Sequence, residues 1–341
     1  MATKPPVEVP QGAIRLNTDS QKLEFFAQEQ WWEMATNQES MTTSARGVFA
    51  GGWSPRLNII EYISINTTGN AIDFGDLTGA RIGTTGTASY TRGVYAMGTI
   101  PGPGVQNTID YITIATAGNA TDFGDATRTG GEAGCYGSAT RGIWAGAGPG
   151  DGTNVIDYVT IASTGNATDF GDLTLKGLGG TGVNSPTRGV LFGRRNDTPA
   201  SGTEHNRIDY VTIPSTGNAV DFGDSQTARC RSQSMCNSTR GVFSGGDGPS
   251  GSLSSIDFIT IATTGNSQDF GEQQFGAGGQ GFNGVSSAIR GVYGVTWNNP
   301  SAYNVLEFIT IAQKGNGTDF GDLTVSGEGQ AGCSNAHGGL Q

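Results

Sequence analysis

The chain has 341 residues, of which 57 are glycine and only 14% are charged, and its formal net charge is −11. Abundant glycine with few charges is typical of many turns and short strands rather than long helices. The acidic balance, with no basic run longer than Arg194-Arg195, disfavours nucleic acid and anionic membranes as partners. No stretch approaches the roughly 18 apolar residues of a membrane helix, so we expect a soluble chain without membrane insertion.

The chain begins with residues 1–11, which contain Pro5, Pro6 and Pro10. Because proline favours an extended backbone, this stretch predicts an N-terminal arm that orders against a neighbouring subunit. Residues 12–35 predict three strands, AIRLN, KLEFFA and WWEM, which are joined by an Asn-Thr-Asp-Ser turn and a second short loop.

Three short strings then recur in a fixed order. The first is Arg-Gly with an apolar residue, the second is an apolar, an acidic and an aromatic residue, as in Ile109-Asp110-Tyr111, and the third is Asp-Phe-Gly followed by Asp or Glu. The first string opens with Arg46, Arg92, Arg141, Arg188, Arg240 and Arg290. The third begins at Asp73, Asp122, Asp169, Asp221, Asp269 and Asp319. A period of about 50 residues predicts a repeat architecture.

Each repeat predicts four antiparallel strands. The segment IDYVTIAST has two fairly apolar faces, as expected of a strand packed on both sides. A Thr-Gly-Asn turn follows and favours a tight hairpin, and the fourth segment consists of small residues, as in GGTGVNSPT. The pattern predicts an all-β fold, a single closed β-propeller over residues 12–341, with the small-residue strands nearest the axis.

The order of these strings resembles the kelch repeat. One strand ends in Gly-Gly, as in residues 48–52 and 242–246, a strand with a tyrosine follows, and then a strand with an aromatic residue. The chain departs from the kelch pattern because phenylalanine, for example Phe74, stands where kelch repeats have tryptophan. The resemblance implies a β-propeller that serves as an interaction domain.

The number of blades depends on the two ends of the chain. Leu23-Glu24-Phe25 repeats the pattern of Leu306-Glu307-Phe308, and Trp32 fits the aromatic place of a third strand. Residues 329–337 match the segment that precedes each Arg-Gly, so pairing them with residues 12–35 would complete a further blade and close the ring. We therefore expect seven blades, with six blades and an N-terminal β appendage as the alternative.

The segment GAIRLNTDSQKLEFF with its following WWEM, and the repeat IDYVTIASTGNATDFGDL, resemble virion structural proteins of tailed bacteriophages. The resemblance covers residues 12–337. It implies a non-enzymatic component of the virion, assembled in the host cytoplasm, that forms a propeller module of a fibre, the tail or a capsid decoration. The expected partners are other virion proteins, with a host-surface glycan or protein as a further candidate for host attachment.

Two other functions remain open. One is a free lectin-like or kelch-like interaction propeller, and the other is a glycoside-acting enzyme, because sequence does not reveal which carboxylates lie close together. The chain has two distant histidines, His205 and His337, and four cysteines without metal-ligand spacing, so we expect no metal and no cofactor. The cysteines Cys135, Cys230, Cys236 and Cys333 are expected to be small buried residues rather than a disulfide framework.

The Asp-Phe-Gly string matches the magnesium loop of protein kinases, but six copies without the other kinase motifs indicate a structural role. We expect Asp73 and its equivalents to accept hydrogen bonds in the following turn, or to pair with a repeat arginine such as Arg92 or Arg141. A calcium ion held between Asp73 and Asp76, or their equivalents, is the alternative.

Loops of variable length alternate with near-constant turns along the chain. In a four-stranded antiparallel sheet, alternate connections emerge at opposite ends, so the variable loops are expected to share one face of the propeller. Variation concentrated on one face of a fixed scaffold is typical of a recognition surface. The candidate binding residues on these loops are Trp53, Arg194, Arg195, His205, Trp297 and Tyr303.

Overall fold

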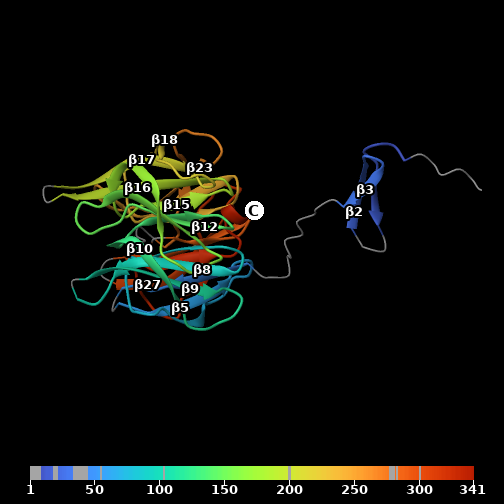
Figure 1. Cartoon of the computed structure of the whole chain (residues 1–341). Coiled ribbons are helices and arrows are strands. Elements are labelled where there is room, and N and C mark those ends of the chain that lie inside the picture. Colours follow the sequence, from blue (N-terminus) through green and yellow to red (C-terminus); the bar gives the residue numbers. More distant parts are fainter. Residues whose placement is uncertain are drawn as a thin grey trace, which may run out of the picture. The chain divides into compact units, whose positions relative to one another are not determined.

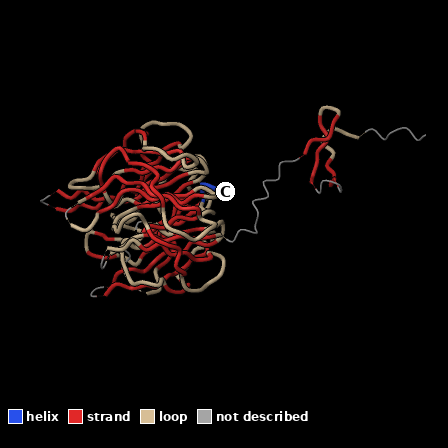
Figure 2. Tube along the Cα trace, turned by 60° about the horizontal axis from the view of Figure 1, so that its bottom comes forward, coloured by secondary structure: helices blue, strands red, loops and turns tan. Residues whose placement is uncertain are grey.

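The computed structural model describes residues 9–17, 22–33, 45–53, 56–102, 104–198, 201–275, 281, 283–298 and 301–341. The chain divides into two units, Met1–Thr43 and Ser44–Gln341 (Figure 1). The regular secondary structure of the described part is strand, apart from one 3-10 helix at Gly338–Leu340, in agreement with the all-β prediction (Figure 2). It contains no helix that is long and apolar enough to span a membrane.

The first unit holds the three strands predicted from residues 12–35. They are β1 (Ile14–Asn17), β2 (Lys22–Ala27) and β3 (Gln30–Glu33). They pair in chain order as one antiparallel sheet.

The second unit contains six four-stranded antiparallel sheets among its described residues, numbered here in chain order. Sheet 1 is β29 (Ala331–Ser334), β4 (Arg46–Ala50), β5 (Ile59–Ser64) and β6 (Ile72–Asp76). Sheet 2 is β7 (Thr85–Ala88), β8 (Arg92–Thr99), β9 (Val105–Thr113) and β10 (Thr121–Gly130). Sheet 3 is β11 (Gly134–Gly137), β12 (Arg141–Ala145), β13 (Thr153–Thr160) and β14 (Thr168–Gly177).

The remaining sheets repeat this order. Sheet 4 is β15 (Thr181–Asn184), β16 (Arg188–Thr198), β17 (Ser201–Thr212) and β18 (Val220–Asp224). Sheet 5 is β19 (Gln233–Cys236), β20 (Arg240–Ser244), β23 (Ser255–Thr260) and β24 (Gln268–Glu272). Sheet 6 is β25 (Val285–Ser286), β26 (Arg290–Asn298), β27 (Ser301–Thr310) and β28 (Thr318–Asp322). A small ribbon, β21 (Asp247–Gly248) and β22 (Gly251–Ser252), lies between β20 and β23 in the chain.

The first strand of each sheet, here called its inner strand, is buried along its whole length. Each inner strand contacts the next, from β7 through β11, β15, β19 and β25 to β29, and β29 contacts β7. Glycines such as Gly86 and Gly182, which lack a side chain, allow this close approach, because a Cβ at Gly182 would overlap the Cys135 carbonyl.

The C-terminal strand corrects the expected pairing of residues 329–337 with residues 12–35. β29 pairs with β4, in a register that places Ala331 opposite Ala50 and Cys333 opposite Val48. The small residues of β29 fit the inner place of sheet 1, where β4 would otherwise present an unpaired edge. The strands β1, β2 and β3 form a three-stranded sheet of their own.

The repeat arginines connect successive sheets through backbone carbonyls and not through the Asp-Phe-Gly aspartates, which corrects the expected Arg–Asp pairing. Each guanidinium lies over the aromatic ring of its own sheet, as Arg46 does over Tyr62 at 4.4 Å, and donates from Nη1 to an isoleucine carbonyl of the next sheet. The acceptors of Arg46, Arg92, Arg141, Arg188, Arg240 and Arg290 are Ile114, Ile161, Ile213, Ile261, Ile311 and Ile65. The last of these bonds joins sheet 6 to sheet 1.

The glycine of Asp-Phe-Gly permits a second contact between sheets. Gly75 has φ of 145°, and a Cβ there would lie 2.6 Å from the carbonyl carbon of Gly118 in the turn of sheet 2. Gly118 N donates to Phe74 O at 2.7 Å, and Asn119 Oδ1 accepts from Asp76 N at 3.1 Å. Five further copies repeat this pattern, including Gly69 N to Phe320 O between sheets 1 and 6.

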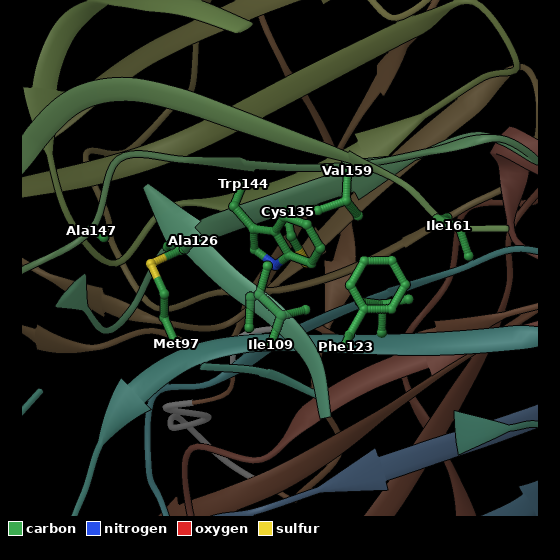
Figure 3. Close-up of a cluster of buried hydrophobic side chains, with 12 residues drawn as sticks. Met97, Ile109, Phe123, Ala126, Cys135, Trp144, Ala147, Val159 and Ile161 are labelled. Carbon is green, nitrogen blue, oxygen red and sulfur yellow. The ribbon is translucent and has the colours of Figure 1, made fainter. Parts of the chain in front are cut away.

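The hydrophobic core is divided into clusters that lie between successive sheets. Figure 3 shows one of them, in which Ile109 and Phe123 of sheet 2 pack with Trp144 and Val159 of sheet 3. Another cluster joins Phe49 of sheet 1 to Val292 of sheet 6 and its neighbours. Burial on both sides explains why both faces of the repeat strands are apolar.

One buried carboxylate recurs in each sheet, at the acidic position of the apolar-acidic-aromatic string. These residues are Glu61, Asp110, Asp157, Asp209, Asp257 and Glu307. Each aspartate has an arginine partner, Arg81, Arg128, Arg194 and Arg229 in that order. Glu61 instead accepts hydrogen bonds from the amide and hydroxyl of Thr324, and burial raises its pKa to about 7.

The pair Arg194–Asp209 tests what these buried charges contribute. Their Nη2–Oδ2 distance is 2.7 Å and both side chains are almost fully buried, so Asp209→Ala leaves an uncompensated guanidinium. We expect the free energy of unfolding, measured by urea denaturation, to fall by about 3–5 kcal/mol. The matched control is Asp151→Ala, whose partner Lys176 is half exposed, and it should cost less than about 1 kcal/mol. Equal effects of the two variants would contradict the assignment.

Candidate functional site

The second unit has two distinct ends. In all six sheets the turn after the third strand, and in sheets 2 to 6 also the turn after the inner strand, lies at one end, here called the turn end. The other connections lie at the opposite end, here called the hairpin end. Figure 1 shows the C-terminus on one side of this unit, and the long strands β16 and β17 extend toward the other. The topology agrees with the expected separation of constant turns from variable loops.

Loops that lead into the inner strands meet at the hairpin end. Glu132 N donates to Gly83 O at 2.8 Å, Gly179 N donates to Glu132 O at 2.8 Å, and Arg231 N donates to Gly179 O at 2.6 Å. These bonds connect the loops before β7, β11, β15 and β19. They hold four neighbouring loops around the end of the inner strands.

Charged side chains cross this end between loops. Arg231 makes a bidentate contact with Glu132, with Nη2–Oε1 at 2.6 Å and Nε–Oε2 at 2.9 Å, and its Nη1 lies 3.5 Å from Asp247 Oδ2. Glu328 lies near Arg231 and Asp247, and burial raises the pKa of its carboxyl. The Glu328 carboxylate has no hydrogen-bond donor among the residues that the structure describes.

An exposed tryptophan adjoins these charges. Trp53 N donates to Glu328 O at 2.8 Å, its side chain is 39% exposed, and the Arg56 guanidinium lies 4.9 Å from its ring. We call Trp53, Glu132, Arg231, Asp247 and Glu328 the mouth cluster. The Trp53 backbone pairs with that of Glu328, and a partly exposed indole at such a place suits a hydroxyl-rich or polar ligand.

The structure separates the six binding residues predicted from sequence. Trp53 belongs to the mouth cluster. Arg194 is only 1% exposed and its guanidinium forms an ion pair with Asp209, so the prediction that it is a surface contact is wrong. Arg195 is partly exposed and pairs through its backbone with Leu178, and His205 lies opposite Arg194 in the β16–β17 pair. Trp297 and Tyr303 lie on β26 and β27, and their side chains are outside the described set.

Sequence reasoning missed Glu132 and Arg231. Both occupy the loop position that is glycine in other repeats, namely Gly83, Gly179 and Gly329, and both have positive φ, 60° and 57°. A charged residue is strained in this left-handed conformation, so its replacement of glycine was the available signal.

A small cavity lies among the inner strands. Its volume is about 30 Å³, and its lining includes Cys135, Asn184, Cys236, Cys333 and His337. This volume suits a water molecule rather than an organic substrate. All four cysteines are buried and free, as predicted, and burial raises the pKa of the Cys135 and Cys333 thiols to about 12, which makes them poor nucleophiles.

The C-terminal segment covers the turn end of this cavity. His337 Nε2 donates to Ala88 O at 2.7 Å, because its Nδ1 accepts from Asn184 Nδ2 and Gly339 N. Tyr90 Oη donates to Leu340 O at 2.5 Å, and Ser238 N donates to Gln341 Oε1 at 3.1 Å. The segment therefore bonds to sheets 2, 4 and 5. Gly338 and Gly339 have no room for side chains.

No protein-family model matches the chain, and a search of curated proteins finds no matching relative. Within the described residues no group of three or more His, Cys, Asp or Glu side chains has the geometry of a metal site.

The buried His337 predicts a pH dependence of stability. Burial lowers its pKa from 6.5 to about 4, so the unfolded chain takes up this proton first as the pH falls. The contribution of neutral His337 is complete above pH 6.5 and decreases toward pH 4, by roughly 3 kcal/mol in total. Urea denaturation at several pH values should show this decrease in the wild type and a smaller one in His337→Gln. His205→Gln is the control, and an unchanged pH profile in His337→Gln would contradict the burial of a neutral imidazole.

Proposed function

We propose that the second unit is a closed β-propeller of six blades, in which β29 completes the first blade. Three series of contacts support this proposal, because each passes through all six sheets and returns to the first. They are the arginine bonds that end at Arg290–Ile65, the turn bonds that include Gly69–Phe320, and the contacts between inner strands that include β25–β29 and β29–β7.

We propose that this propeller is a non-enzymatic binding module whose ligand contacts lie at the hairpin end. The observation that carries the proposal is the mouth cluster, where exposed Trp53 adjoins the nearly buried Glu328. The opposite end is occupied by the C-terminal segment, where Asn335 Oδ1 accepts a hydrogen bond from Arg46 N. The turn end thus holds the C-terminal segment, while the hairpin end carries the variable loops.

We further propose that the chain is a structural component of a tailed-phage virion, in a fibre, the tail or a capsid decoration. The sequence resemblance over residues 12–337 supports this proposal. A separate small N-terminal unit suits attachment to other virion proteins, and the variable loops of the second unit suit display toward a host surface. A free lectin-like propeller is the second candidate, and the mouth cluster favours a glycan ligand for it.

A binding test uses the full chain against a glycan array and against isolated host-surface polysaccharide. Trp53→Ala should weaken binding at least about 30-fold, as loss of a central aromatic contact does. Lys314→Ala, at the turn end, is the control and should stay within about twofold. Unchanged binding by Trp53→Ala would contradict the mouth cluster, and release of new reducing ends from the polysaccharide would contradict a non-enzymatic role.

The location in the particle has its own test. Mass spectrometry of purified virions of the phage that encodes the chain should detect it at a fixed copy number, and antibody labelling in the electron microscope should place it on the particle. Its absence from the virions, together with glycan binding by the isolated protein, would favour the free lectin-like propeller.

A further inference from the structure

One buried carboxylate of the second unit has no internal partner. Glu328 is only 9% exposed, and within the described part of the chain it accepts no hydrogen bond and forms no ion pair. Every other buried carboxylate that the structure describes has such a contact. The buried aspartates of sheets 2 to 5 and Glu24 form ion pairs with arginine, and Glu61 and Glu307 accept hydrogen bonds. Because a buried charge without a partner lowers stability, Glu328 indicates a contact that the chain itself does not supply.

The fold does not require a charge at this place. Glu328 and Trp53 form an isolated antiparallel bridge, and sheets 2 to 5 each contain the corresponding bridge between the loop before the inner strand and the hairpin that follows the second strand. The residues that occupy the place of Glu328 in these bridges are all uncharged: Ile82, Gly131, Leu178 and Cys230. The scaffold therefore accepts small or apolar residues there, and the carboxylate departs from the repeat.

The surroundings of Glu328 carry a negative charge. Arg231 and Asp247 lie near its carboxylate. The Arg231 guanidinium is already bound by Glu132, at 2.6 and 2.9 Å, and its Nη1 lies 3.5 Å from Asp247 Oδ2. Three carboxylates and one guanidinium give the mouth cluster a formal charge of −2. This charge attracts a cation to the vicinity of Glu328.

A cation that donates hydrogen bonds suits this place better than a metal ion. Among the described residues no group of three acidic, histidine or cysteine side chains has the geometry of a metal site. An ammonium group instead supplies one positive charge and up to three N–H donors, which a single carboxylate can accept.

The bridge between Glu328 and Trp53 indicates what carries the ammonium group. Residues directly opposite each other in an antiparallel pair have their side chains on the same face, with Cβ atoms about 4.5–5.5 Å apart. The partly exposed indole of Trp53 therefore begins beside the carboxylate of Glu328. An indole can pack against the apolar C–H face of a sugar ring, so one ligand can contact both side chains.

We propose that Glu328 binds the ammonium group of an amino sugar whose nitrogen is not acetylated, while Trp53 contacts the ring of that sugar. The proposal names the ligand class of the mouth cluster and therefore rests on the binding function proposed above. Acetylation removes the positive charge and two of the three N–H donors, so the site distinguishes a free amino sugar from its acetylated form.

Isothermal titration of the full chain with two oligosaccharides tests this distinction. The probes are the β-1,4-linked trimers of glucosamine and of N-acetylglucosamine, at mildly acidic pH where the free amino groups carry their protons. The glucosamine trimer should bind at least about tenfold more tightly, as expected for a hydrogen bond between two charged groups. Glu328→Gln should abolish this preference. The matched control is Asp151→Asn, which removes a carboxylate outside the mouth cluster and should keep the preference.

The outcomes separate this proposal from the binding function on which it rests. If both trimers bind equally and Trp53→Ala weakens both, the mouth cluster binds glycans and the assignment of Glu328 to an ammonium group is wrong. Binding of neither trimer would overturn the amino-sugar proposal outright. A trilysine peptide that binds as tightly as the glucosamine trimer would also overturn it, because attraction of any cation would then explain the result.

Stability gives a second measurement that does not depend on a ligand. Glu328→Leu introduces the residue that sheet 4 has at this place, Leu178. The melting temperature of this variant should equal or exceed that of the wild type, because the change removes an unpaired charge, while its preference for the glucosamine trimer is lost. A lower melting temperature would contradict the proposal, since it would show that the carboxylate serves the fold.

Discussion

The contact on which the second unit depends is the one that each sheet makes with the next. An arginine at the start of the second strand is held over an aromatic ring of its own sheet and donates to a carbonyl of the neighbouring sheet. A charged donor that bonds to a neutral carbonyl fixes the spacing of two sheets without burying a second charge. Six copies of the same bond give all sheets the same mutual geometry, and that common geometry permits the sixth sheet to contact the first.

Buried carboxylates complete this arrangement. Thr78 of the connection after sheet 1 donates to Asp110 of sheet 2, and Thr174 donates to Asp209 of sheet 4 in the same way. Each carboxylate thus contacts the preceding sheet: the four aspartates pair with arginine, burial raises the pKa of Glu61, and Glu307 accepts a hydrogen bond from the Tyr293 hydroxyl. Because these polar groups are satisfied within the scaffold, the loops of the hairpin end are free to differ between repeats.

The repeated sequence strings predicted much of this architecture. The six predicted arginines are the first residues of β4, β8, β12, β16, β20 and β26, and the small-residue segments became the buried inner strands. The partner of β29 was not predictable, because the small residues Ala-Gly-Cys-Ser would fit as the inner strand of any sheet that lacks one. The burial of Arg194 could not be predicted from the sequence, because the strand register shifts between Phe192 and Arg194. This shift breaks the alternation by which inward and outward side chains are assigned. The mouth cluster joins residues almost 100 positions apart, such as Glu132 and Arg231, and no local pattern connects them.

Native-state labelling of Cys333 tests the proposed closure of the six sheets into a propeller most directly. Cys333 lies on β29 against Tyr95 of sheet 2, whereas Cys135 lies on the inner strand of sheet 3, far from either end of the second unit in sequence. If β29 completes sheet 1 and joins the last sheet to the first, a thiol reagent should modify Cys333 as slowly as Cys135, through the same global unfolding. Modification of Cys333 much faster than Cys135 would contradict the account, because it would show that the circle of sheets opens at β29 while the rest stays folded.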